Sequence, residues 1–216
     1  MNAPPVAFVF VHGWGFDAGF WDGVRAHLPE AETLTVDLGF RGPAEGLKAM
    51  PPGRTVAVGH SLGFLWLLHE KPFAWDGLVS INGFAKFTAS DGFPSGIDGR
   101  MVARMKDKIR TTPEAVVADF LGACGHADPP DTLAPAALDP AALERGLDWL
   151  MAWDGRAALQ GETVLALAGR ADPIVPPDLS EASFGRNLQW HEGGHLLPVT
   201  APAWCADRLR AFARTI

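Results

Sequence analysis

Three side chains far apart in the sequence, Ser61, Asp172 and His195, are of the types that together perform nucleophilic acyl transfer. In such a triad the histidine takes the proton of the serine hydroxyl, and the carboxylate fixes the tautomer of the histidine. We therefore predict that Ser61 is the nucleophile, that His195 is the general base and that Asp172 orients His195.

The serine stands in the segment Gly59-His60-Ser61-Leu62-Gly63, directly after an apolar, β-rich run and before an apolar helical pattern. Glycines on both sides of a serine permit a sharp, strained strand-to-helix turn that exposes the hydroxyl. The Leu62 amide would then lie at a helix N-terminus and could bind an oxyanion. An ordinary strand–helix turn is the alternative interpretation of the same pentapeptide.

A second glycine motif, His12-Gly13-Trp14-Gly15, follows the first apolar run of the chain. A loop at this point can supply a second amide to an oxyanion, and we assign that role to Trp14. The alternative, a tight turn with the Trp14 side chain in the core, is compatible with it. We expect His12 and His60, one in each motif, to hydrogen-bond to backbone near the site.

The acid and the base each have a competitor. His195 lies in Gly193-Gly194-His195-Leu196 after the last predicted strand, but His191 ends that strand. Asp172 follows the preceding strand, where an Asp-Pro pair could also simply form a turn. Asp178 is the alternative acid.

Short, nearly continuous apolar runs alternate with helical patterns along the chain, which indicates strands buried on both faces of a parallel sheet. Active sites of such sheets lie beyond the carboxyl ends of the strands, where the candidate residues fall. The predicted strands are Val6–Val11, Thr33–Val36, Thr55–Val58, Leu78–Ile81, Thr163–Ala168 and, more weakly, Asn187–His191. Predicted helices are Phe20–Leu28, Leu62–His69 and one starting near Pro202.

The stretch between the fourth and fifth predicted strands breaks this alternation. It contains three helical candidates, Ile97–Arg110, Pro113–Ala123 and Pro140–Met151, and a proline-rich loop, Asp128–Pro135. Thr112 and Asp139 precede prolines and are predicted to cap the second and third helices. We expect residues 85–156 to form a helical cap inserted into one α/β core made of residues 1–84 and 157–216.

Several classes of protein are excluded by composition and motif. The net charge of −7 over 216 residues argues against a nucleic-acid-binding protein, and no apolar run is long enough to span a membrane. The motifs contain neither the lysine of a phosphate-binding loop nor metal-ligand spacing, so we expect no cofactor and no metal. Without secretory features near Met1 or a cysteine framework, the chain is predicted to be cytoplasmic.

The order serine, aspartate, histidine on these elements predicts the α/β-hydrolase fold, with a mostly parallel sheet and helices on both faces. Within it, the run from Phe8 to Phe212 resembles the pimeloyl-acyl carrier protein methyl ester carboxylesterases of biotin synthesis. The resemblance is carried by the helical cap and by short motifs. These are His12-Gly13-Trp14-Gly15, Val36-Asp37-Leu38, Ser61-Leu62-Gly63, Phe87…Asp91…Phe93-Pro94…Gly96-Ile97 and Gly194-His195. It implies the same triad, with Trp14 and Leu62 flanking the bound ester and Phe87 near the substrate.

The first helix of the predicted cap bears on the substrate. Met101 and Met105 belong to an apolar stripe that would line an acyl pocket or pack the cap onto the sheet. Five basic residues and one acid give Gly99–Arg110 a net charge of +4. Arg100, Arg104 and Lys108 recur at i, i+4 spacing and would attract an acidic carrier protein, unless they only solvate an exposed face.

We accordingly predict ester hydrolysis through an acyl-enzyme, on the methyl ester of a carrier-linked pimeloyl chain. One alternative is a general short-chain carboxylesterase or thioesterase without a carrier partner. Another is a catalytically silent protein that only binds a ligand in the same pocket.

Overall fold

The computed structural model describes residues 6–125 and 138–216, and these contain a six-stranded sheet in the order β2-β1-β3-β4-β5-β6. Every pairing between these strands is parallel. The strands are β1 (Val6–Val11), β2 (Glu32–Val36), β3 (Arg54–His60), β4 (Gly77–Ile81), β5 (Val164–Gly169) and β6 (Leu188–His191). β1, β3 and β4 are almost wholly buried, as continuous apolar runs require in a sheet covered on both faces.

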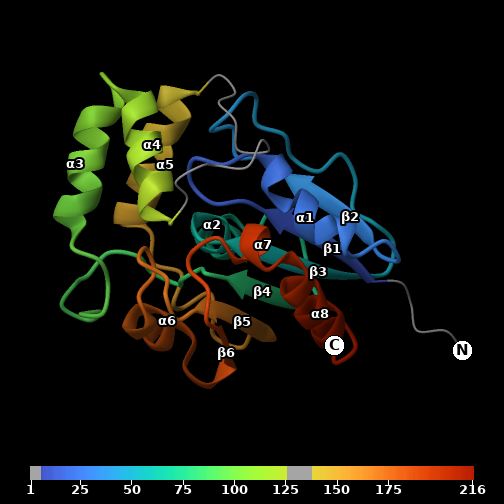
Figure 1. The fold of residues 1–216 in the computed structure, drawn as a ribbon. Coiled ribbons are helices and arrows are strands. Elements are labelled where there is room, and N and C mark those ends of the chain that lie inside the picture. Colours follow the sequence, from blue (N-terminus) through green and yellow to red (C-terminus); the bar gives the residue numbers. More distant parts are fainter. Residues whose placement is uncertain (1–5, 126–137) are drawn as a thin grey trace, which may run out of the picture.

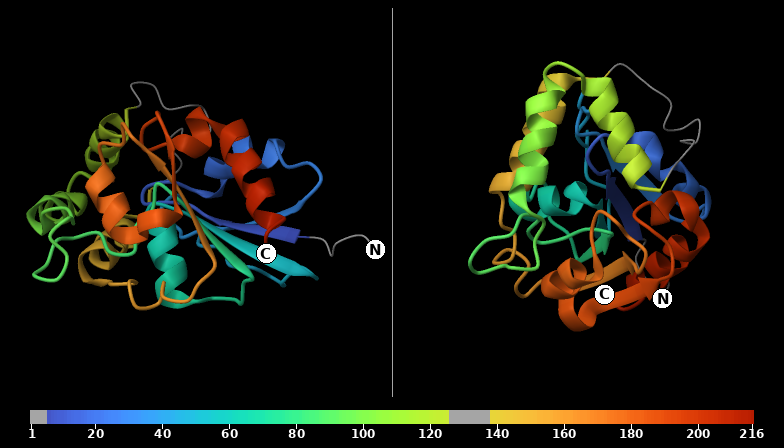
Figure 2. Two further views of the ribbon diagram at one scale, coloured as in Figure 1. Left: turned by 90° about the horizontal axis from the view of Figure 1, so that it is seen from below. Right: turned by 60° about the vertical axis from the view of Figure 1, so that its left-hand side comes forward.

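Helices cover both faces of the sheet (Figures 1 and 2). One face carries the 3-10 turn η1 (Ala18–Trp21) with α1 (Asp22–Ala26), α7 (Leu197–Thr200) and α8 (Pro202–Ala213), which contact one another. The other carries α2 (Leu62–Glu70) and α6 (Pro177–Phe184), joined by a ring contact of 5.3 Å between Phe64 and Phe184. This two-sided cover buries the strands and leaves their carboxyl ends available for a site.

Three further helices, α3 (Gly99–Ile109), α4 (Pro113–Ala123) and α5 (Pro140–Ala152), are inserted between β4 and β5 and pack together beside the sheet (Figure 1). Asp139 caps α5 by accepting bonds from the amides of Ala141 and Ala142. Thr112 is the N-cap residue of α4 as predicted, but its side chain makes no capping hydrogen bond and its hydroxyl donates to the Lys108 carbonyl at the end of α3.

Other differences from the predicted elements are local. The helix expected over Phe20–Leu28 is a 3-10 turn followed by a short α-helix, and α6 and α7 were not predicted. A short 3-10 turn, η3 (Gly185–Asn187), precedes β6. The proline-rich loop Asp128–Pro135 lies outside the described residues.

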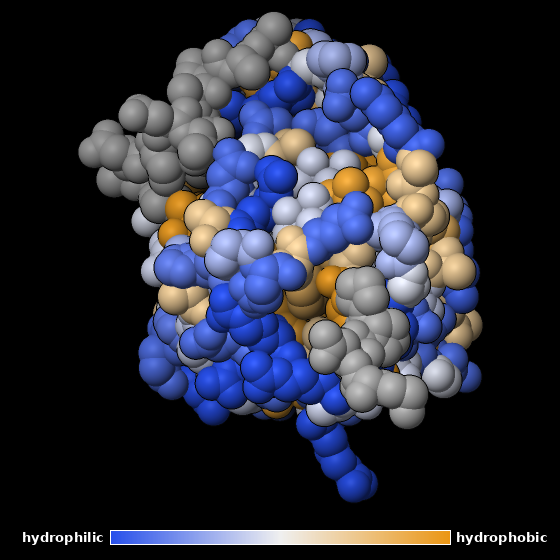
Figure 3. Space-filling view, turned by 90° about the vertical axis from the view of Figure 1, so that its right-hand side faces the viewer, coloured by the Kyte–Doolittle hydropathy of each residue, from blue (hydrophilic) through white to orange (hydrophobic). Residues whose placement is uncertain are grey.

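Within the described ranges no helix has the length and hydropathy needed to cross a membrane. The face near both termini is mostly hydrophilic, with apolar side chains in small groups (Figure 3).

Candidate active site

The nucleophile candidate Ser61 sits in a strained turn between β3 and α2. Its φ of 52° and ψ of −122° lie in a region that residues with a side chain rarely adopt. Glycine is required on both sides of Ser61 because other backbone atoms lie too close for a side chain. A Cβ on Gly59 would lie 2.4 Å from Phe64 Cα, and one on Gly63 would lie 2.3 Å from the Val11 carbonyl oxygen. The turn thus packs α2 directly against β1 and β3, with Ser61 at its apex.

Asp172 and His195 form a buried hydrogen-bonded pair at the ends of neighbouring segments. His195 Nδ1 lies 2.9 Å from Asp172 Oδ2, and the two residues are 0% and 5% exposed. Asp172 follows β5, and its other oxygen accepts the amides of Ile174 and Val175 at 2.8 and 2.9 Å. Because Asp172 is held on both oxygens, it can fix His195 with the proton on Nδ1 and the lone pair on Nε2.

The structure does not join Ser61 to this pair by a hydrogen bond. His195 Nε2 is buried and has no hydrogen-bond partner within the described part of the chain. Ser61 is 6% exposed and is among the residues that line an apolar cavity. Nucleophile–base hydrogen bonds are commonly long in unliganded enzymes and shorten when substrate is bound.

The two predicted oxyanion amides belong to segments that meet at Ser61. Leu62 is the first residue of α2, so its amide has no acceptor in its own helix. The loop of Trp14 lies close by, since a Cβ on Gly13 would be 3.1 Å from Ser61 Cβ. Arg41 fixes the same loop by donating from Nε to the Gly15 carbonyl.

The Trp14 side chain connects this loop to the inserted helices. Its indole Nε1 donates to the Leu143 carbonyl in α5 at 2.9 Å, and its ring meets Phe120 of α4 edge-on at 5.1 Å. The Trp14 side chain therefore packs against the inserted helices, as predicted. These side-chain contacts do not involve its backbone amide.

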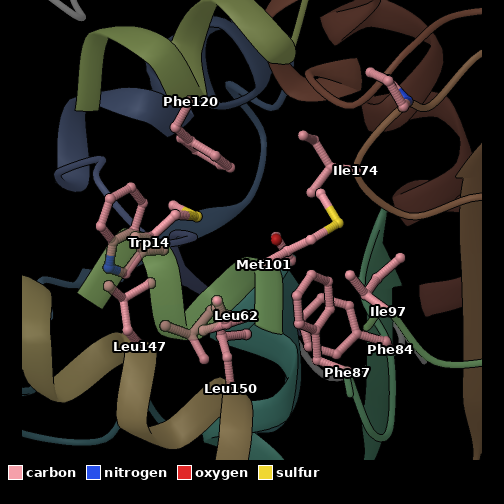
Figure 4. Close-up of a pocket in the computed structure, with 14 residues that line it drawn as sticks. Trp14, Leu62, Phe84, Phe87, Ile97, Met101, Phe120, Leu147, Leu150 and Ile174 are labelled. Carbon is pink, nitrogen blue, oxygen red and sulfur yellow. The ribbon is translucent and has the colours of Figure 1, made fainter. Parts of the chain in front are cut away.

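An apolar cavity of about 110 Å³ adjoins Ser61 between the sheet and the inserted helices. Figure 4 shows Trp14 and Leu147 on one side of it and Phe84 and Phe87 on the other. Of the described residues that line it, none carries a formal charge, and Ser61 alone carries a hydroxyl. The lining residues are Trp14, Ser61, Leu62, Phe84, Phe87, Ile97, Met101, Val102, Met105, Phe120, Leu147, Leu150, Pro173 and Ile174. The four residues assigned to substrate binding from the sequence, Trp14, Phe87, Met101 and Met105, are among them.

A second, more open cavity of about 310 Å³ lies between α3 and α4. It shares Met101, Met105, Phe120 and Ile174 with the first, so the two cavities adjoin at these residues. Its charged lining residues are Arg104 and Lys108 of α3 and Asp119 of α4.

The basic residues of α3 differ in their pairing. Lys106 pairs with Glu144 and Asp148 of α5, Arg110 pairs with Glu144, and Arg100 pairs with Asp98 at its own helix start. The net charge of +4 counted on the helix is therefore largely balanced by neighbouring acids. Arg104 and Lys108 are the cations of this helix that border the second cavity.

Neither competitor for the triad lies in the same arrangement. His191 Nδ1 accepts the Gly193 amide at 2.8 Å, and its ring packs on Trp204 of α8. Asp178 is exposed in the first turn of α6. In the described ranges no group of three or more His, Cys, Asp or Glu side chains could hold a metal ion.

Both motif histidines bond to backbone near the site. His12 lies 2.9 Å from the Gly13 carbonyl through Nδ1 and accepts the Leu38 amide on Nε2 at 3.0 Å. His60 Nε2 lies 3.0 Å from the His195 carbonyl. Sequence reasoning missed Asn82, whose amide donates to Asp172 Oδ2 at 2.8 Å. Its place directly after β4, at the same edge as Ser61, was the available signal.

Comparison with known proteins places these features in a family. No family model matches the chain. A pimeloyl-[acyl-carrier protein] methyl ester esterase of Klebsiella pneumoniae is 30% identical, with 94% of this chain and 92% of that protein covered. The biotin biosynthesis bifunctional protein BioHC of Cellvibrio japonicus is 29% identical over 84% of this chain, which spans only 41% of that longer protein.

Solved structures agree with the fold. The esterase EaEST from Exiguobacterium antarcticum superposes with a TM-score of 0.79 at 16% identity, covering 99% of this chain and 93% of that one. The predicted α/β-hydrolase fold and the resemblance inferred from the sequence motifs are thereby confirmed. With its identity and coverage to the Klebsiella protein, the chain belongs to the family of pimeloyl-[acyl-carrier protein] methyl ester esterases.

Proposed function

We propose that the chain hydrolyses a carboxylic ester through an acyl-enzyme, with Ser61, His195 and Asp172 as the catalytic triad. The observation that carries this proposal is the buried His195–Asp172 hydrogen bond of 2.9 Å beside a strained serine turn that opens into an apolar cavity. The fold and the family of the chain are those of ester hydrolases, which supports the same reaction class.

The proposed reaction has two halves. Ser61 Oγ attacks the ester carbonyl carbon while its proton passes to His195 Nε2, and the amides of Trp14 and Leu62 hold the carbonyl oxygen as it becomes negative. The imidazolium, stabilised by Asp172, then protonates the departing alkoxide, so an alcohol leaves and Ser61 is acylated. Water, deprotonated by the same histidine, attacks the acyl-enzyme and releases the acid.

The cavity favours a substrate without charge near its reacting end. A free carboxylate in a lining with no charged side chain would lose its hydration without gaining an ion pair, which is costly. A methyl ester is neutral and of small volume on the alcohol side. We therefore propose the methyl ester of a carrier-linked pimeloyl chain, the substrate in the names of the relatives, as the preferred substrate.

The second cavity supports a carrier partner. In such a substrate the far end of the acyl chain is attached to a protein, so the chain needs a route from Ser61 to the surface. The space between α3 and α4 adjoins the first cavity, and Arg104 and Lys108 are among the residues that line it. We propose that these two cations, and the exposed Arg100, attract an acidic acyl carrier protein.

Two wider assignments belong to the same proposal. Residues 85–156 would act as a cap over a core formed by residues 1–84 and 157–216, and the enzyme would work in the cytoplasm. A general short-chain carboxylesterase or thioesterase, or a silent ligand-binding protein, would use the same fold without the carrier.

The test is hydrolysis of carrier-linked pimeloyl methyl ester beside p-nitrophenyl butyrate, with Ser61→Ala as the inactive control. Activity on both substrates that is lost in the control supports the proposal, and activity on the small ester alone leaves a general carboxylesterase. Binding of an ester without turnover by the unaltered chain would indicate a silent binding protein.

Charge reversal tests the carrier separately. The double variant Arg104→Glu/Lys108→Glu should lower kcat/KM on the carrier-linked ester about tenfold or more, because electrostatic attraction raises association rates by this order. It should leave p-nitrophenyl butyrate hydrolysis nearly unchanged. Arg186→Glu/Arg214→Glu alters the net charge equally outside the inserted helices and serves as the matched control. Equal losses on both esters would remove the docking role.

A further inference from the structure

The loop that carries His195 is held by three donors on three consecutive carbonyls. Ala171 N donates to Gly193 O at 3.1 Å, Asn82 Nδ2 to Gly194 O at 3.2 Å, and His60 Nε2 to His195 O at 3.0 Å. We call this arrangement the histidine-loop cradle. Two of its three donors are side chains, so the position of the loop depends on the identity of residues 60 and 82.

The donors come from the carboxyl ends of three adjacent strands. His60 is the last residue of β3, Asn82 follows the end of β4, and Ala171 follows β5, in a sheet where β3, β4 and β5 are neighbours. Since Ser61 directly follows His60, the same strand end carries both the nucleophile and one support of the base. The cradle therefore connects the loop of His195 to the ends of β3, β4 and β5, and the end of β3 also carries Ser61.

His60 is suited to this task because it is a neutral donor in the core. Its acceptor is a carbonyl, so Nε2 carries the proton, while Nδ1 is buried without a partner. Burial, followed by the nearby His195, lowers the pKa of His60 well below 6.5. Its ring packs against that of Phe20 at 4.5 Å and that of His195 at 4.9 Å. The imidazole is thus fixed both by packing and by its single hydrogen bond.

Asn82 links the acid to the base. Its two amide protons go to Asp172 Oδ2 at 2.8 Å and to the Gly194 carbonyl. The residue has a φ of +49°, in the left-handed region that asparagine tolerates better than most residues. One side chain therefore sets the separation between the carboxylate of the proposed triad and the loop that carries its histidine.

We propose that His60 and Asn82 are positioning residues that hold His195 in register with Ser61 through the carbonyls of Gly194 and His195. This inference rests on the proposed function, because it takes His195 as the general base. The need for such supports follows from Gly193 and Gly194, which give the loop wide backbone freedom. A base displaced by about 1 Å can cost on the order of 10²-fold in rate.

The test compares two nearly isosteric replacements of His60. In His60→Gln the amide nitrogen occupies the place of Nε2 and can donate to the His195 carbonyl, whereas His60→Met puts a methyl group there. We expect His60→Met to lower kcat on p-nitrophenyl butyrate by about 10- to 100-fold relative to the unaltered chain. The kcat of His60→Gln should be at least about tenfold higher than that of His60→Met. KM should change by less than about threefold, because His60 does not line the cavity.

Two further variants separate positioning from packing. Phe20→Leu disturbs the same ring cluster without removing a donor, so it should lower thermal stability and keep kcat. Asn82→Gly keeps the left-handed backbone, removes the amide and should lower kcat as His60→Met does. Equal kcat for His60→Gln and His60→Met, or an equal loss in Phe20→Leu, overturns the inference.

Ser61→Ala is measured first in the same assay. If it remains active, the proposed function fails; if it is inactive and the His60 pair does not differ, only the cradle fails.

Discussion

Replacing Asp172 with asparagine isolates the role of this carboxylate in the proposed mechanism. Oδ1 of Asp172 accepts the amides of Ile174 and Val175, and Oδ2 accepts from Asn82 and lies 2.9 Å from His195 Nδ1. All four neighbours are donors, so the new amide group must face two of them. Placing it toward the backbone amides would leave two buried N–H groups without acceptors, at about 1–3 kcal/mol each.

The alternative orientation costs less in stability but more in rate. With the new amide toward His195, the imidazole must accept on Nδ1 and carry its proton on Nε2, where it can no longer take the proton of Ser61. Asn82 can rotate its amide to offer the oxygen that now lacks a partner. The Gly194 carbonyl then loses its donor.

We therefore expect Asp172→Asn to fold and to lose most of its activity. The expected loss in kcat is about 10⁴-fold, or about 5 kcal/mol of transition-state stabilisation, as for a histidine held in the wrong tautomer. The assay is steady-state hydrolysis of p-nitrophenyl butyrate, with thermal unfolding to verify folding and Asp178→Asn as the control. If Asp172→Asn keeps more than a tenth of kcat while Asp178→Asn does not, the assignment of the acid is wrong.

The remaining predictions concern stability. Gly63→Ala should lower the free energy of unfolding by about 3 kcal/mol or more, since its Cβ would lie 2.3 and 2.4 Å from two backbone oxygens. Gly122→Ala, in α4 with no atom within 4 Å of the new Cβ, should instead stabilise by about 0.5–1 kcal/mol. Equal effects in urea denaturation would contradict the packing argument. His60 should make stability fall as the pH drops below about 6.5, because burial keeps it neutral in the folded chain while the unfolded chain binds a proton. The free energy of unfolding should change less with pH in His60→Gln than in the unaltered chain. An identical pH dependence of both proteins between about pH 5 and 8 would refute the role of His60.

Periodic, local signals predicted the sheet well. Val6–Val11 matches β1 residue for residue, and the other strands agree to within two residues at each end. Pro113 and Pro140 start helices where the sequence placed them. Such features depend on nearby residues alone. The missed elements, α6 and α7, are eight and four residues long and have prolines in their first turns, which also occur in loops.

Contacts between distant residues account for what the sequence could not predict. The motifs indicated Ser61, Asp172 and His195. The place of Asn82 after a strand put it at the same edge of the sheet, but no pattern in the sequence showed that its amide would bond to Asp172, 90 residues away. Similarly, the basic pattern of α3 contained no sign that Lys106 and Arg110 would meet Glu144 and Asp148 of another helix. Surface pairs of this kind each contribute at most about 1 kcal/mol, yet they decide which cations stay available to a partner.

Trp14 connects the inserted helices with the proposed oxyanion site. Its backbone lies in the loop beside Ser61, while its indole donates to the Leu143 carbonyl of α5 and its ring contacts Phe120 of α4. Phe120 also lines both cavities. A movement of α4 or α5 that opened the route between the cavities would therefore act on the Trp14 side chain. Arg41 donates from Nε to the Gly15 carbonyl of the same loop, and its own backbone pairs with Leu138 just before α5. The loop beside Ser61 is thus tied to the inserted segment through both the Trp14 side chain and Arg41, so a change in the position of that segment would reach the proposed oxyanion site.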